Sequence, residues 1–292
     1  MRLDIDGRNC ELESGRSILD AVKKEGLDSI MLSDRPLAAQ IGGEVFNLRF
    51  TPKKDTQIHL LRYGEDMGRR VYERTLQFLF ILAMRKEFPR ARVCVRYSLG
   101  PGLFITVDGM EEPFNEEAAL KVETEMRRLV RLKLPLERRR ISIKEALSFY
   151  EQDGQADKAK LLKWRRFSYF DVYQIDGYMD YFYGEMAPDT SYADVFRVKY
   201  VHDGAVVLLM PRNDAPDVPS DYVDLPKLHA VFHQSDEWGK LMECATVNDL
   251  NTHIQNGTIR ELVRINEALH DRGYADIADK IVQKGAKAVL VA

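Results

Sequence analysis

The 292-residue sequence has no apolar run long enough to cross a membrane, and its first ten residues lack a signal-peptide core. Its three cysteines (Cys10, Cys94 and Cys244) form neither a Cys-x-x-Cys pair nor an even framework, so we expect reduced thiols. A net charge of −3 argues against a dedicated nucleic-acid clamp. These absences predict a soluble, cytoplasmic protein that does not contact a membrane.

Apolar residues are nevertheless plentiful: 45% of the chain is hydrophobic and 30% charged, which at this length is typical of about two globular domains. Residues 1–62 alternate strand-like runs with one helix, for which Ser17 is the predicted N-cap and Gly26 the end. The pair Gly42-Gly43 between two apolar runs predicts a hairpin. We therefore expect a small mixed β-sheet that carries one helix.

The pattern changes after residue 62, and residues 63–211 predict a second α+β domain. Its first helix covers residues 66–88 and ends before Pro89, because the residue before a proline disfavours helical backbone. Two further helices are predicted to begin at the caps Asn115 and Ser142. Strand-like runs dominate the remainder of this domain.

Residues 212–285 are predicted to be a linker followed by a helical connector. The linker is rich in proline and aspartate and has no periodicity, which is typical of an exposed segment. Residues 227–284 show helical patterns. Residues 286–292 contain the apolar run "AVLVA", which predicts a buried strand of the kind found inside parallel sheets.

The first of these regions resembles a TGS domain, the ubiquitin-like β-grasp module of threonyl-tRNA synthetases and some GTPases. The helix "SILDAVKKEG" and the strand order carry that resemblance. The second region resembles the second additional domain of threonyl- and alanyl-tRNA synthetases, which hydrolyses mischarged tRNA. It rests on "GRRVYERTLQFLFILAMRKEFP", "KEALSFYEQDGQADKAKLL" and "GYMDYFYGEMAPDT". Together the resemblances imply an α+β protein.

The residues that would perform this hydrolysis are missing from the sequence. The synthetases carry two histidines four apart on the first helix and a later Cys-x-x-x-His, a constellation suited to Zn²⁺ or an activated water. The positions that we align with them here are Arg74 and Phe78, then Phe182 and Met186. We therefore expect a filled apolar site with no catalytic residue, no metal, no cofactor and no editing activity.

The order of the regions, ending in "KAVLVA", resembles bacterial uridine kinase-like proteins, in which a P-loop kinase follows. The resemblance implies that the chain is truncated before a kinase domain in cis, which would bind ATP and Mg²⁺ and phosphorylate a nucleoside. Two functions stay open. The chain is either a non-catalytic regulatory or substrate-recruiting region of such a kinase, or a stand-alone RNA- or tRNA-binding module related to threonyl-tRNA synthetase.

One dense basic run is a candidate RNA-binding surface, with Trp164 beside it as a stacking residue. The alternative is a set of solvated helix ends, and the negative net charge of the chain favours it. The candidate residues are Arg127, Arg128, Arg131, Arg138, Arg139, Arg140 and Trp164.

Two histidines, His229 and His233, stand four residues apart on a predicted helix, a spacing that suits two metal ligands. They lack the glutamate of a His-Glu-x-x-His motif, and only Asp236 or Glu237 lies close enough in sequence to be a third ligand. We therefore favour a solvated or partly packed pair.

Overall fold

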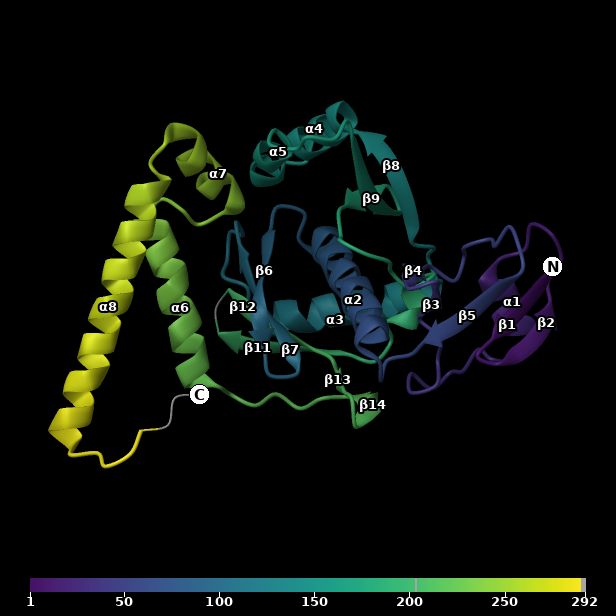
Figure 1. The fold of residues 1–292 in the computed structure, drawn as a ribbon, viewed down its shortest axis with the longest axis horizontal. Coiled ribbons are helices and arrows are strands. Elements are labelled where there is room, and N and C mark those ends of the chain that lie inside the picture. The colour runs from purple at the N-terminus through teal and green to yellow at the C-terminus, as the bar shows by residue number, and fades with distance from the viewer. Residues whose placement is uncertain (203, 290–292) are drawn as a thin grey trace. The chain divides into compact units, whose positions relative to one another are not determined.

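The computed structural model describes residues 1–202 and 204–289, which form an α+β protein with several mixed or antiparallel sheets. The chain divides into two compact units (Figure 1). Unit 1 contains Met1–Ile141 and Asp171–Leu225, and unit 2 contains Ser142–Phe170 together with the chain from Pro226 onward. The second domain that the sequence predicts, residues 63–211, is therefore divided: residues 142–170 belong to unit 2 and the remainder to unit 1.

A five-stranded sheet and one helix occupy the first 61 residues. The helix α1 (Ile18–Lys24) covers this sheet, and the strand order is β2-β1-β5-β3-β4, with only β1 and β5 parallel. The strands are β1 (Arg2–Ile5), β2 (Arg8–Glu11), β3 (Ala38–Ile41), β4 (Glu44–Phe46) and β5 (Thr56–Leu61). A mixed sheet with one helix was predicted from the sequence, and it is confirmed.

The local signals for α1 and for the hairpin act as expected. The Asp20 backbone N–H donates to Ser17 Oγ at 3.2 Å, and Asp20 Oδ2 accepts from the Ser17 backbone N–H at 2.9 Å, forming a capping box. The apolar face of α1 packs into a cluster with Leu3 and Ile5 of the sheet. The predicted turn between β3 and β4 places Gly42 and Gly43 at φ of 57° and 90°, where glycine is favoured.

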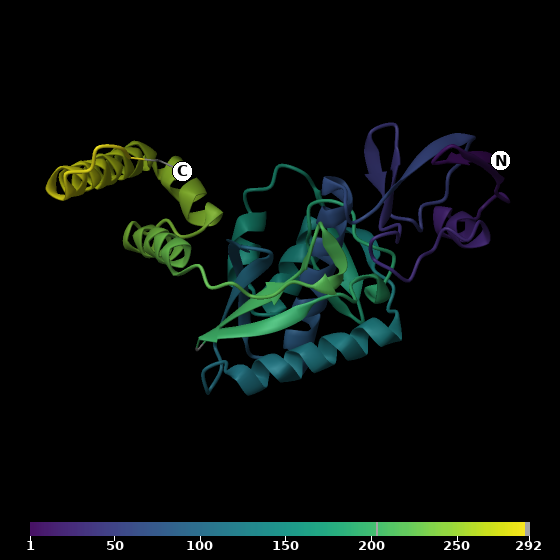
Figure 2. The same ribbon diagram turned by 90° about the horizontal axis from the view of Figure 1, so that it is seen from below.

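A four-stranded antiparallel sheet of order β11-β12-β7-β6 forms the centre of the remaining part of unit 1. Two long helices, α2 (Asp66–Glu87) and α3 (Glu116–Leu132), pack against each other, and α3 also contacts β11 (Figure 2). Asn115 caps α3 as predicted, accepting from the Ala118 N–H at 2.9 Å. The strands are β6 (Arg92–Leu99), β7 (Gly102–Asp108), β11 (Arg197–His202) and β12 (Ala205–Leu209).

A third sheet of order β10-β9-β8 lies next in the chain, followed by a short 3-10 helix, η1 (Thr190–Tyr192). Its strands are β8 (Glu137–Ser142), β9 (Tyr169–Ile175) and β10 (Tyr178–Asp180). Two helices, α4 (Ile143–Gln152) and α5 (Ala156–Leu162), are inserted between the neighbouring strands β8 and β9. The inserted helices belong to unit 2, and this insertion is why the sequence pattern did not delimit the units.

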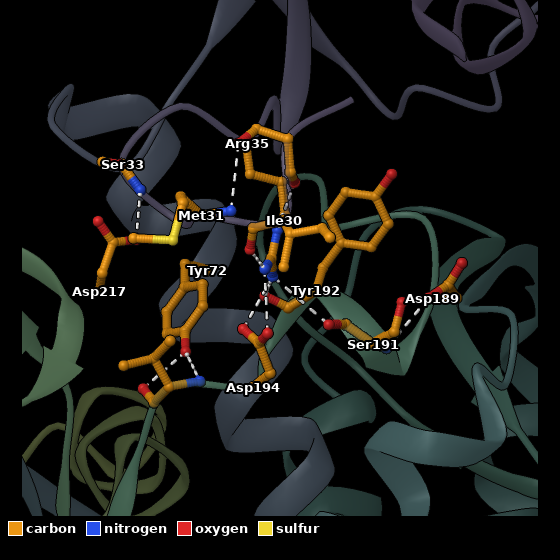
Figure 3. Close-up of polar contacts among 12 residues, drawn as sticks. Ile30, Met31, Ser33, Arg35, Tyr72, Asp189, Ser191, Tyr192, Asp194 and Asp217 are labelled. Atoms are coloured by element: carbon orange, nitrogen blue, oxygen red, sulfur yellow. Dashed lines mark hydrogen bonds and ion pairs between the residues drawn. The ribbon is translucent and has the colours of Figure 1, made fainter. Parts of the chain in front are cut away.

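A buried arginine fastens the first sheet to the segment around η1 within unit 1 (Figure 3). The side chain of Arg35 is 9% exposed, and its guanidinium forms a bidentate ion pair with Asp194, at 2.8 and 3.0 Å. It also donates to the carbonyl groups of Ser29 and Tyr192, each at 3.2 Å, and of Ile30. Every donor of this fork therefore has a fixed acceptor, which compensates for its burial.

Most residues of the segment 212–225, predicted to be an exposed linker, are exposed, but the segment also contains structure that was not predicted. The strands β13 (Pro211–Arg212) and β14 (Ala215–Pro219) form a small hairpin, and Ser220 is buried with its hydroxyl donating to the Met210 carbonyl. Tyr222 and Leu225 then pack against the apolar cluster on the four-stranded sheet. Prolines are compatible with this arrangement because a two-stranded ribbon leaves edge N–H positions unpaired.

The C-terminal part of unit 2 is helical, as predicted for residues 227–284. It contains α6 (Pro226–Leu241), α7 (Val247–Asn256) and α8 (Ile259–Lys284). Residues 286–289 do not form the expected strand, and residues 290–292 of that prediction lie outside the described residues. No helix in the described part of the chain is long and apolar enough to cross a bilayer.

Candidate functional site

The four positions aligned with the hydrolytic site come together in unit 1. Arg74 and Phe78 lie one helical turn apart on α2, and Phe182 and Met186 lie in the segment that follows β10. The ring centroids of Phe78 and Phe182 are 5.5 Å apart, and Phe78 and Met186 have no exposed surface. Apolar side chains therefore occupy this place.

A close backbone approach holds Arg74 against the same segment. Its Nε donates to the Glu185 carbonyl at 2.9 Å, while burial lowers the pKa of the guanidinium. A Cβ built on Gly184, whose φ is +113°, would lie 2.9 Å from Arg74 Cζ. Glycine at residue 184 is therefore what allows the arginine to lie across the loop.

The polar groups around this apolar centre are bound to one another. The hydroxyl of Tyr173 donates to Glu185 Oε2 at 3.0 Å and accepts from the Met186 N–H at 3.2 Å. Burial, reinforced by the negative charge of Glu185, raises the pKa of Tyr173 far above its usual value. Thr75 Oγ1 accepts from the Ala187 N–H at 3.0 Å. These contacts fix the loop onto α2 and β9.

The carboxylate of Asp171 completes the network on β8 and β9. It accepts from Arg140 at 2.8 Å and from Arg138 at 3.1 Å, and Arg138 also pairs with Glu185. The hydrogen bond from Arg140, followed by that from Arg138, outweighs burial and lowers the pKa of Asp171. A raised tyrosine pKa and a lowered aspartate pKa are both far from what a general base near neutrality requires.

The chain is similar to the N-terminal part of threonine–tRNA ligases. It is 25% identical to the ligase of Clostridium kluyveri over 194 residues, which is 66% of this chain and 30% of the ligase. It is 28% identical to that of Acetivibrio thermocellus over 160 residues, and 27% identical to that of Carboxydothermus hydrogenoformans over 175.

The match to the Acetivibrio thermocellus ligase covers 54% of this chain and 24% of that ligase. The match to the Carboxydothermus hydrogenoformans ligase covers 57% of this chain and 26% of that ligase. The chain therefore spans less than a third of the length of each of these relatives. No family model matches the chain.

The basic run, which would be the natural RNA contact of a ligase-like module, is largely neutralised in the structure. Arg127 pairs with Glu123 at 3.0 Å, and Arg128 forms a bidentate pair with Glu125. On β8, the pairs of Arg138 and Arg140 are those given above, and Arg139 donates to Gln174 at 2.6 Å. Among the described residues, Arg131 alone of the six makes no hydrogen bond or ion pair. RNA binding by this run stays a prediction.

Trp164 follows α5 after one residue and is half-buried. Its Nε1 donates to Asn248 Oδ1 at 3.0 Å, which ties α5 to α7 inside unit 2. The exposed aromatic side chains of this segment are instead Phe167 and Tyr169, which we did not single out as a pair. Their signal was the sequence "WRRFSYF", in which aromatic residues follow directly on a basic run.

His229 and His233 both lie on α6, with ring centroids 6.4 Å apart. Across residues 1–202 and 204–289, no three histidine, cysteine, aspartate or glutamate side chains are grouped so that they could hold a metal ion. A protein zinc site needs three or four such ligands, so the pair stays a two-residue candidate.

Proposed function

We propose that this chain is an RNA-binding module related to the N-terminal part of threonine–tRNA ligase, with tRNA as its ligand and without editing activity. In this proposal residues 1–62 are a TGS-like β-grasp domain and the region after it is an editing-like domain. The observation that carries the proposal is the similarity to the ligases, joined to the apolar packing of Phe78, Phe182 and Met186.

The residues present at the editing-like site favour binding over hydrolysis. Hydrolysis of an aminoacyl ester needs a group that accepts a proton from water or a ligand set that activates one. Phenylalanine offers neither, and the guanidinium of Arg74 stays a cation that is already bound to the Glu185 carbonyl. The carboxylates of Glu185 and Asp171 in the surrounding network are held by arginines.

The alternative proposal is a non-catalytic N-terminal region of a nucleoside kinase, with ATP and Mg²⁺ bound by a further domain in cis. No specific observation favours it. The comparisons support a relation to threonine–tRNA ligases and give no evidence for a kinase. The ligase similarity therefore makes RNA binding the preferred proposal.

The test combines a binding assay with a hydrolysis assay on the full chain. We expect threonine-specific tRNA to bind more tightly than the roughly 1–100 μM of non-specific association at physiological salt. Mischarged threonine-specific tRNA should lose its amino acid no faster with the protein than in buffer. Binding no tighter to tRNA than to duplex DNA would overturn the proposal, and protein-dependent deacylation would overturn its non-catalytic part.

A further inference from the structure

Two aromatic side chains stand exposed in unit 2, where the chain passes from α5 into β9. Phe167 is 61% exposed and Tyr169 is 36% exposed, and their ring centroids are 5.8 Å apart with the planes tilted by 40°. The Ile143 N–H donates to the Ser168 carbonyl at 3.2 Å, and Phe170 is buried. The backbone between and behind the two rings is therefore anchored, and the rings are held on the outside.

Basic side chains are dense in the sequence directly before these rings. Residues 158–166 include five basic and no acidic side chains, although the whole chain carries a net charge of −3. Lys160, Lys163 and Arg166 are exposed, and in the described part of the chain none of them makes an ion pair or hydrogen bond. Arg165 lies over the Phe170 ring at 4.7 Å and donates to the Tyr169 carbonyl at 3.3 Å, so its charge also stays in the patch.

The basic run on α3 and β8 differs from this patch in one decisive respect. A phosphate that approached Arg128 or Arg140 would have to displace Glu125 or Asp171 from a short ion pair. A phosphate that approaches Lys163 displaces only water. Protein cations that neutralise phosphates release the counterions condensed on the nucleic acid, and this release drives the electrostatic part of binding. Unpaired cations such as Lys163 can do so without first breaking an ion pair.

We propose that Phe167, Tyr169, Lys160, Lys163 and Arg166 form a platform for single-stranded RNA. This inference rests on the proposed RNA-binding function and gives it a location. Exposed aromatic faces stack on bases of any sequence, and neighbouring cations contact the phosphates. Paired bases in a duplex hide their faces against one another, so the platform takes single-stranded segments such as loops and ends.

The experiment is an anisotropy titration of the full chain with fluorescein-labelled oligouridine, and with the same strand in a duplex with oligoadenosine. Phe167→Ala should weaken oligouridine binding at least about fivefold, whereas Phe167→Trp should retain it. The double variant Lys163→Gln, Arg166→Gln should lower the slope of log K against log salt by about 1.4. Matched controls on α8 are Tyr274→Ala, also 61% exposed, and Lys280→Gln, and neither should change the affinity.

The outcomes separate this inference from the function on which it rests. If tRNA binds but Phe167→Ala binds oligouridine as tightly as the parent, the platform is wrong and the RNA-binding function stands. If neither tRNA nor oligouridine binds, the proposed function fails and the platform fails with it. If oligoglutamate displaces oligouridine as effectively as unlabelled RNA does, the patch is a surface for acidic peptides and the inference is overturned.

Discussion

Replacing Arg35 with methionine should lower the free energy of unfolding of unit 1 by about 3 kcal/mol. The substitution keeps an unbranched apolar stem, but it removes every donor that reaches Asp194 and the surrounding carbonyl groups (Figure 3). Breaking a buried ion pair from one side costs about 3–5 kcal/mol. The side chain of Asp194 is 33% exposed, so water partly restores its solvation, and we expect the lower end of that range.

A second variant apportions the effect. Asp194→Asn leaves the Arg35 guanidinium, only 9% exposed, without its counter-charge but still bonded to the carbonyls of Ser29 and Tyr192, so it should also cost about 3 kcal/mol. The double variant should then be less destabilised than the sum of the two single variants, because both disrupt the same pair.

The assay exploits the positions of the two tryptophans, Trp164 and Trp238, which both lie in unit 2. Urea unfolding followed by tryptophan fluorescence reports on unit 2, whereas far-ultraviolet circular dichroism also follows the sheets of unit 1. We expect Arg35→Met to shift a dichroism transition and to leave the tryptophan transition in place. A loss below about 1 kcal/mol would refute the reasoning, since ordinary surface substitutions reach about half of that.

Two other predictions concern pH and packing. His59 bonds Glu65 at 2.7 Å and Asp6 at 2.8 Å, and both bonds raise its pKa, so its stabilisation is present below about pH 6.5 and lost as pH rises through the raised value. Urea unfolding should give the parent a lower free energy of unfolding at pH 8 than at pH 6, and this difference should be absent in His59→Gln. The same difference between the two pH values in both proteins would contradict the prediction. Gly68→Ala should destabilise unit 1 by about 1–3 kcal/mol, because its Cβ would lie 1.9 Å from a backbone oxygen. The matched change Gly273→Ala, in an open part of α8, should instead stabilise its helix by up to about 1 kcal/mol in thermal unfolding.

Elements whose causes are local in sequence could be predicted, and those held by distant contacts could not. Ser17 and the apolar residues after it define α1 within ten residues of chain, so pattern reasoning found it. The hairpin in the segment 212–225 was not predicted because its stabilising contacts come from far away in the sequence. Tyr63 donates to the Pro211 carbonyl at 2.7 Å, and Asp217 accepts from the Ser33 N–H at 3.0 Å. Composition alone cannot show contacts across such separations.

The same limit applies to the candidate sites. Arg74 and Phe78 lie against the loop of Phe182 and Met186, contacts between residues about a hundred positions apart that no local pattern reveals. Counting the arginines of the basic run likewise says nothing about the carboxylates that neutralise them, and Asp171 follows Arg140 by 31 residues.

The insertion of α4 and α5 between β8 and β9 has a consequence for how the protein is made. During synthesis these helices leave the ribosome before α7 does. However, α5 packs against α7, and Trp164 can form its hydrogen bond only after Asn248 has been synthesised. All of unit 1 has been translated by Leu225, before that partner exists. The nascent chain therefore carries an incompletely packed helical pair through the interval in which unit 1 folds. Removing residues from the C-terminus would accordingly expose a surface in the middle of the sequence.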